Sequence, residues 1–140
     1  MPRFRHVAIP VVTAAAITVA TATSTFAATI DDQAVTVGAR GIVGFSRDGD
    51  VFRILDVDVD GMGVRLQYTN PTTGTPSTSH TKVNVNYTGG YTGWDYDNAF
   101  VYNTNFDEDA CFYFRAGLVD NGSYVDGTYG SWILACAKNG

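Results

Sequence analysis

The sequence has little positive charge, few cysteines and almost no histidine, and each shortage argues against a class of function. Its 140 residues hold nine lysines and arginines against fourteen aspartates and glutamates. Proteins that bind nucleic acids or anionic membranes need clustered positive charge to contact phosphate groups. The scattered basic residues therefore argue against both partners. The acidic excess favours solubility, or the binding of a cation at a local cluster.

Motifs of common hydrolases and of redox or metal sites are also missing. After residue 28 the only histidine is His80, and no Cys-x-x-Cys or Gly-x-Ser-x-Gly motif occurs. A triad around His80 would need Ser77 or Ser79 from the same proline-containing loop, which is poor preorganisation. The aspartates could supply the two carboxylates of a glycosidase, but a chain of this length leaves little room for a cleft. We therefore expect no enzymatic activity.

The longest apolar stretch lies at the N-terminus and is typical of a secretory signal peptide. A short basic start precedes the apolar, threonine-containing run 7–22, and small residues occupy the −3 and −1 positions before a cleavage point after Ala27. We expect residues 1–27 to be removed, which makes the protein secreted and extracellular with no membrane attachment. The alternative is a membrane anchor. The run is short for a span of about 20 residues, however, and Pro10 interrupts it.

The exported chain has room for one domain with one core. We assign residues 28–34 to a polar leader and residues 35–140 to the folded domain, and we expect a monomer. Seven basic residues then face fourteen acidic ones, which gives a formal net charge of −7. The only two cysteines, Cys111 and Cys136, predict one disulfide in an oxidising compartment. It would close a loop of about 26 residues, a constraint worth roughly 3 kcal/mol in the chain-entropy model.

Strand patterns dominate after residue 28, whereas sustained helical periodicity is absent. Apolar and polar residues alternate in 64–69, 83–87 and 110–118, and turn residues separate such runs about every 8–12 positions. Asn121-Gly122 predicts a tight hairpin. We therefore expect an all-β fold, a single antiparallel β-sandwich of seven to nine short strands. A small closed barrel is the alternative.

Residues 48–70 contain the best-marked predicted hairpin. Two strand-like runs, 51–57 and 64–69, are joined by an acidic segment that ends in Asp60-Gly61. Aspartate and glycine favour turn conformations. We therefore place a turn at 58–61.

The same acidic segment is the candidate metal site. Asp56, Asp58 and Asp60 stand at alternate positions before Gly61, as in the first half of a calcium loop. The match then fails, because Gln67 stands where a bidentate glutamate is expected and the flanks are strands. We favour a plain turn with no cofactor, and calcium bound by the three aspartates is the alternative.

Residues 87–102 combine aromatic side chains with glycines. Tyr91, Trp94 and Tyr96 on a rigid β surface could stack on sugar rings, with neighbouring polar side chains bonding to hydroxyl groups. The competing interpretation is that these rings pack in the core or at its rim. A glycan site requires the three rings to be exposed together.

Five short motifs occur along the chain from about Gly41 to Ala137. In chain order they are Asp48-Gly49-Asp50, Phe52-x-Ile54-x-Asp56, Asp60-Gly61-x-Gly63-Val64-Arg65, Cys111-Phe112-Tyr113-Phe114 and Gly130-Ser131-Trp132 followed by Ala135-Cys136-Ala137. In these motifs the chain resembles a group of small exported actinobacterial proteins, mostly without an assigned function. The resemblance implies a disulfide-bonded β-sandwich. It implies no catalytic residues.

These observations predict a secreted, non-catalytic binding or interaction module whose partner is an unassigned protein or glycan. One alternative is an inhibitor of an extracellular hydrolase that presents a rigid loop, either 70–79 or 88–97. Another is a carbohydrate-binding module that uses the loop carrying Tyr91, Trp94 and Tyr96.

Overall fold

Nine antiparallel strands make up the fold. The structure, a computed structural model, describes residues 27–137, so the predicted signal peptide lies outside the described residues except for Ala27. The strands are β1 (Asp32–Val35), β2 (Gly41–Ser46), β3 (Val51–Asp56), β4 (Gly63–Thr69), β5 (Lys82–Tyr87), β6 (Phe100–Asn103), β7 (Cys111–Asp120), β8 (Ser123–Tyr124) and β9 (Ile133–Cys136).

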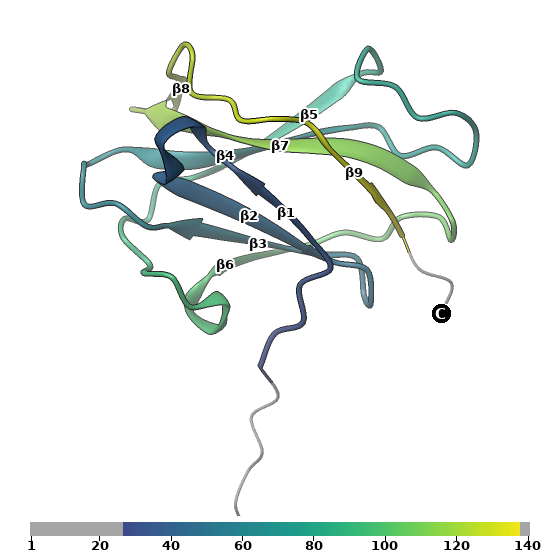
Figure 1. The fold of residues 1–140 in the computed structure, drawn as a ribbon, viewed down its shortest axis with the longest axis horizontal. Helices are drawn as coiled ribbons and strands as arrows, with labels where there is room; N and C mark the ends of the chain where they lie inside the picture. Colours follow the sequence, from purple (N-terminus) through teal and green to yellow (C-terminus); the bar gives the residue numbers. More distant parts are fainter. Residues whose placement is uncertain (1–26, 138–140) are drawn as a thin grey trace, which may run out of the picture.

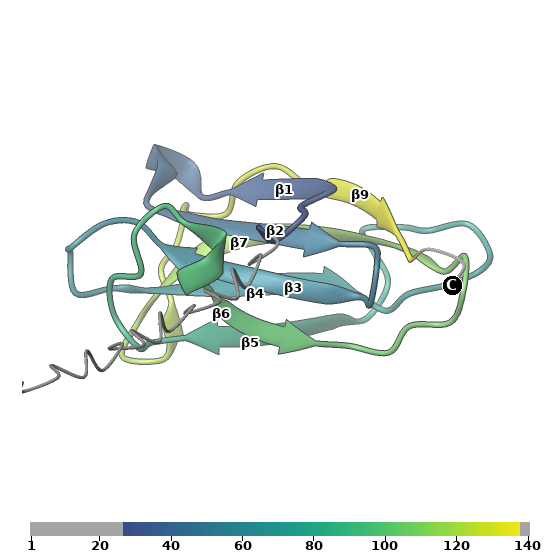
Figure 2. The same cartoon turned by 90° about the horizontal axis from the view of Figure 1, so that it is seen from below.

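The strands form two sheets that pack face to face (Figure 1, Figure 2). Sheet A has the order β1-β2-β3-β6, and sheet B has the order β5-β4-β7, with β8 and β9 both pairing with β7. Within residues 27–137 the helical segments are two three-residue 3-10 turns, η1 (Val37–Ala39) and η2 (Tyr96–Asn98). No helix in this range is long and apolar enough to cross a membrane. The predicted all-β sandwich is confirmed.

Phenylalanine rings from both sheets form the centre of the core. Phe45 and Phe52 of sheet A and Phe112 and Phe114 of sheet B are completely buried. The ring centroids of Phe45 and Phe112 are 5.0 Å apart in an edge-to-face arrangement, a geometry that aromatic pairs prefer. The core is thus assembled from inward side chains of both sheets, and a smaller apolar cluster of Ile42, Leu55 and Val57 lies apart from it.

The predicted hairpin of residues 48–70 is wrong. β3 pairs with β2 and β6, whereas β4 pairs with β5 and β7. Residues 57–62 therefore cross from sheet A to sheet B at one corner of the sandwich (Figure 1). The alternation of apolar and polar residues shows only which side of a strand faces the core. Two consecutive strands can therefore show the same pattern whether they pair in one sheet or lie in opposite sheets.

Sheet A also includes part of the segment assigned to the polar leader. β1 begins at Asp32, and Ala34 is buried in the core. The Asp32 carboxylate accepts from the Arg47 guanidinium at 3.1 Å, which ties β1 to the far end of β2. The polar residues of β1 therefore belong to an edge strand of sheet A and not to a loose chain terminus.

The disulfide and the tight hairpin lie where the sequence predicts them. Cys111 and Cys136 are directly opposed on β7 and β9, with 4.0 Å between their Cα atoms, and they form the predicted disulfide. Asn121 and Gly122 have φ of 48° and 80° between the paired ends of β7 and β8. Positive φ at both central residues is the geometry of a two-residue hairpin turn.

Four connections gather at one end of the sandwich, which we call the loop end. They are residues 36–40, 57–62, 88–99 and 121–122, and they lie on the left in both views (Figure 1, Figure 2). The connection 70–81 lies at the opposite end. Every residue that the sequence proposed for metal or glycan binding lies in or next to the loop end.

Candidate functional site

The loop end exposes apolar side chains that the core does not use. Among the described residues, the four most exposed large hydrophobic side chains are Val59 (81% exposed), Trp94 (62%), Val37 (55%) and Tyr91 (54%). Three of the four loop-end connections contribute them. Exposed apolar groups gathered in one region are typical of surfaces that contact a partner.

Thr92 fixes the connection 88–99 to the edge of sheet A. Its backbone N–H donates to the Asp56 carbonyl at 2.8 Å. Its hydroxyl donates to the same carbonyl at 3.0 Å and accepts from the Asp56 N–H at 2.9 Å. Tyr91 and Trp94 flank this anchor closely. They are therefore presented from a constrained backbone.

Tyr96 packs on the outer side of sheet A instead of joining the two exposed rings. Its ring lies over Gly44, where an added Cβ would stand 2.7 Å from the ring. Its hydroxyl donates to Gln33 Oε1 at 3.0 Å. Burial against Ile42 and Leu55 raises the pKa of the Tyr96 hydroxyl. Of the three rings predicted to contact a glycan, Tyr91 and Trp94 are thus exposed and Tyr96 is half-buried.

An ion pair connects two of the loop-end segments. Arg40 Nη1 lies 3.2 Å from Asp60 Oδ2, and the other oxygen of Asp60 accepts from the Met62 N–H at 2.8 Å. The first contact joins 36–40 to 57–62, and the second closes a local turn. Surface ion pairs contribute little stability by themselves. The contact matters here because it gives Asp60 a cationic partner within the protein.

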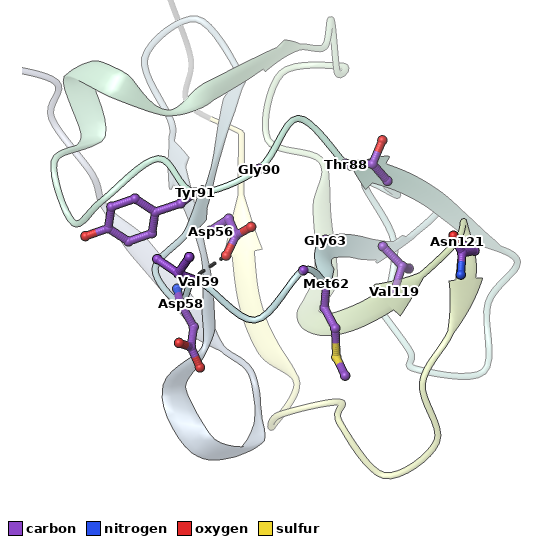
Figure 3. A pocket seen from close by; sticks show the side chains of 11 residues that line it. Asp56, Asp58, Val59, Met62, Gly63, Thr88, Gly90, Tyr91, Val119 and Asn121 are labelled. Atoms are coloured by element: carbon purple, nitrogen blue, oxygen red, sulfur yellow. Dashed lines mark hydrogen bonds between the residues drawn. The ribbon is translucent and has the colours of Figure 1, made fainter.

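A cavity of about 340 Å³ opens between the loop-end connections (Figure 3). Asp56, Val59 and Tyr91 line one side of it, and Val119 and Asn121 line the other. Two of these side chains are apolar and exposed. The cavity is therefore a recess with an apolar rim and a carboxyl group in its wall.

Asp56 is almost completely buried, with 3% of the residue exposed. Burial raises its pKa, the hydrogen bond from the Asp58 N–H opposes this shift, and the charges of Asp60 and Asp58 add to it. The folded protein therefore holds Asp56 where ionisation is unfavourable.

The three aspartates proposed for calcium lie close in sequence but do not form a cluster of ligands. The Asp58 carboxylate points away from that of Asp56 (Figure 3), and Asp60 is paired with Arg40. Across residues 27–137, no three Cys, His, Asp or Glu side chains are arranged to hold a metal ion. The backbone leaves the strand at Asp56, so the alternation that would place the three carboxylates on one face ends there.

The outer side of sheet B carries two ordered rows of polar side chains that the sequence analysis did not identify as a site. In one row Arg115, Gln67 and Asn84 are directly opposed on β7, β4 and β5. Arg115 Nε and Nη2 donate to Gln67 Oε1 at 2.8 and 2.7 Å, and Gln67 Nε2 donates to Asn84 Oδ1 at 2.8 Å. In the next row Arg65 Nε donates to Asn86 Oδ1 at 2.7 Å.

Aromatic rings from the segment after β7 pack against these rows. The Arg115 guanidinium carbon lies 3.8 Å from the ring centroid of Tyr129 and 4.2 Å from that of Trp132. Tyr129 stacks on Tyr124 with 4.2 Å between centroids. Gly117 makes room for this arrangement, because a Cβ there would meet the Tyr129 ring at 2.7 Å. We call the surface of Arg65, Gln67, Arg115, Tyr124, Tyr129 and Trp132 the arginine–aromatic face.

Only a weak signal for this face exists in the sequence. Arg65, Gln67 and Arg115 stand at polar positions of alternating strands, which predicts that they point away from the core. Which residues stand opposite one another depends on pairing between strands up to about fifty residues apart. Local alternation carries no information about that register.

Comparison of the chain with protein-family models, with curated proteins and with solved structures found no match. Any functional conclusion therefore depends on the geometry of the loop end and of the arginine–aromatic face.

Proposed function

We propose that the protein is a secreted, non-catalytic binding module that contacts an extracellular partner through the loop end. The observation that supports this best is the position of Val37, Val59, Tyr91 and Trp94, the four most exposed large hydrophobic side chains of the described chain, at one end of the sandwich. Aromatic side chains on constrained backbone contribute large contact area at low entropic cost.

Secretion is part of the proposal. A disulfide between Cys111 and Cys136 suits an oxidising compartment, and the N-terminal residues follow the signal-peptide pattern. We further propose that the protein is a monomer and belongs with the small exported actinobacterial proteins that it resembles. Nucleic acids and membranes are not among the partners that we propose, because its formal charge after signal cleavage is negative.

Affinity capture tests the proposal. The tagged protein is incubated with cell-wall glycans and with secreted proteins, in parallel with a Tyr91→Ala/Trp94→Ala variant and with Val101→Ala. Val101 is an exposed apolar residue on β6, outside the loop end, so it serves as the matched control. We expect the wild type and Val101→Ala to retain the same partner and the double variant to lose it. Equal capture by all three proteins would contradict the proposal.

An inhibitor of an extracellular hydrolase is a second candidate function, and the anchored connection 88–97 favours it. Such a loop must be protruding and fixed. The three hydrogen bonds between Thr92 and Asp56 fix this one. The other candidate loop, 70–79, is fixed near its start, where Thr72 exchanges two backbone hydrogen bonds with Cys111. Capture of an enzyme whose activity falls on binding would favour this function.

A carbohydrate-binding module is the third candidate. Tyr91 and Trp94 offer exposed rings, with Asp95 and Asp97 near them in the chain. Tyr96 is occupied by its contacts with sheet A, so a sugar would have to bind with two rings. Capture of a cell-wall glycan, abolished in Trp94→Ala, is the result that this function predicts.

A further inference from the structure

We infer that the arginine–aromatic face is a second binding surface and that its occupant is the carboxylate-rich surface of a partner protein. This inference goes beyond the proposed function and is independent of it. The face lies on the outer side of sheet B, whereas the connection that carries Trp94 is anchored to sheet A.

The charge of the face is opposite to that of the chain. Three of the seven basic residues after residue 28 occupy outward positions of β4, β5 and β7, namely Arg65, Lys82 and Arg115. None of the outward positions of these three strands is acidic. A patch of one sign on a protein of the other sign favours a partner of complementary charge.

The polar side chains of the face are already ordered. Gln67 is buried, accepts two bonds from Arg115 and donates to Asn84, and Arg65 is held by Asn86. Solvated arginines on a sheet surface usually move among many rotamers and would lose that freedom on binding. Here the ordering is achieved within the free protein, so less entropy is lost when a partner binds.

Arg115 retains an unused edge. Its Nε and Nη2 donate to Gln67, and no described residue forms a hydrogen bond with Nη1. The edge formed by Nη1 and Nη2 matches the two oxygens of a carboxylate, which a guanidinium binds with two parallel hydrogen bonds. Because Gln67 and the rings of Tyr129 and Trp132 hold the guanidinium, the donors on that edge have a fixed direction.

The rings favour a protein over a glycan as the source of the carboxylates. Tyr129 stacks with Tyr124 and also contacts Arg115, so its faces are engaged within the protein. Sugar rings bind by stacking on free aromatic faces, and the ring of Tyr129 at the centre of this arrangement has none to offer. Tyrosine, tryptophan and arginine are also the residues that dominate binding energy at protein–protein interfaces.

The two tryptophans of the chain allow each surface to be observed separately. Trp94 lies at the loop end and Trp132 on the arginine–aromatic face, and no other tryptophan occurs. In a Trp94→Phe protein, tryptophan emission, excited where tyrosine does not absorb, therefore reports on Trp132 alone. The probe is an oligo-glutamate peptide at low ionic strength, with polygalacturonate as an acidic glycan and dextran as a neutral one.

We expect oligo-glutamate to change the Trp132 emission in a saturable way and dextran to leave it unchanged. Arg115→Lys keeps the charge but loses the planar fork, and we expect it to weaken binding about tenfold. Lys82→Gln removes a charge at an exposed site without touching the rings, and we expect a smaller but measurable loss. Arg47→Gln is the matched control, because Arg47 pairs with Asp32 away from the face, and its affinity should be unchanged.

Thermal melts of each variant show whether it is folded. If Arg115→Lys does not fold, Lys82→Gln compared with Arg47→Gln decides. No emission change with oligo-glutamate, or equal affinities in Lys82→Gln and Arg47→Gln, would overturn the inference. Tighter binding of polygalacturonate than of oligo-glutamate would overturn the choice of a protein as the occupant.

Discussion

At the scale of single residues, Asp56 is a carboxyl side chain whose burial disfavours its ionised form. It is buried at the junction of β3 and the connection 57–62, and that burial raises its pKa. A raised folded-state pKa means that the folded protein binds the proton more tightly than the unfolded chain does. The associated stability is present below the unfolded-state pKa and is lost as the pH rises through the folded-state pKa.

Replacing Asp56 by asparagine should therefore stabilise the protein at neutral pH. The amide cannot ionise, and its oxygen can still accept from the Asp58 N–H. We expect a higher denaturant midpoint for Asp56→Asn than for the wild type at pH 7, and a difference that disappears as the pH falls below the unfolded-state pKa of aspartate, about 3.9. Asp126→Asn, at an exposed turn position, is the control and should give no such gain. A less stable Asp56→Asn protein at pH 7 would contradict this interpretation.

The same residues lead to a prediction about calcium. Asp60 already pairs with Arg40, and the Asp58 carboxylate points away from Asp56 (Figure 3), so binding calcium would require these side chains to rearrange. We expect calorimetric titration to give no binding heat and the melting temperature to be the same in chelator and in millimolar calcium. A clear rise in melting temperature with calcium would restore the metal site.

At the scale of structural elements, Thr92 is the side chain that joins the connection 88–99 to the end of β3. Thr92→Val keeps the shape of the side chain but removes both hydroxyl bonds and leaves the Asp56 N–H without its acceptor. We expect a loss of about 1–3 kcal/mol in the free energy of unfolding, together with faster proteolysis within 88–99. Thr88→Val, at an exposed position of the same connection, should change neither quantity appreciably. If both variants behave like the wild type, the anchor is not at Thr92.

The disulfide ties β9 to β7 at the edge of sheet B. A Cys111→Ser/Cys136→Ser double variant should lower the free energy of unfolding by roughly 3 kcal/mol, because the unfolded chain regains the freedom of a 25-residue separation. Urea denaturation of the variant and of the wild type, each with and without reductant, measures the effect. Reductant should destabilise the wild type and leave the variant unchanged, and equal stabilities without reductant would refute the estimate.

The elements show which parts of the fold a sequence can predict. The alternation in β4 and β7 and the Asn121-Gly122 turn depend on neighbours in the chain, and all three are confirmed. The predicted pairing of β3 with β4 is wrong, because the apolar pattern does not specify in which sheet a strand lies. The arginine–aromatic face was missed for a related reason, since Arg115 meets Gln67 only through a register between distant strands.

The same distinction applies to the candidate sites. The disulfide was predictable because the chain contains only one possible pair of cysteines. The glycan hypothesis named Tyr91, Trp94 and Tyr96 together, but sequence spacing cannot tell a ring that is exposed from one that covers a glycine. Tyr96 can pack on sheet A only because Gly44, on a strand distant in the sequence, has no side chain there.

At the scale of the whole molecule, the residues that hold the fold together differ from the residues that are available to contact a partner. The phenylalanine-rich core and the disulfide hold the two sheets, while the loop end and the arginine–aromatic face present side chains that the core does not need. We propose that the loop end binds the main partner and that the second surface gives the molecule a separate acidic partner. A small domain with two such surfaces is suited to connecting two other molecules.

Hydrogen–deuterium exchange of the protein alone and in complex with its captured partner tests the central proposal most directly. We predict slower exchange in residues 57–62 and 88–97 of the complex, with exchange in 70–81 at the opposite end unchanged. Protection confined to 70–81, or no protection at the loop end, would contradict the proposal that the loop end is the binding surface.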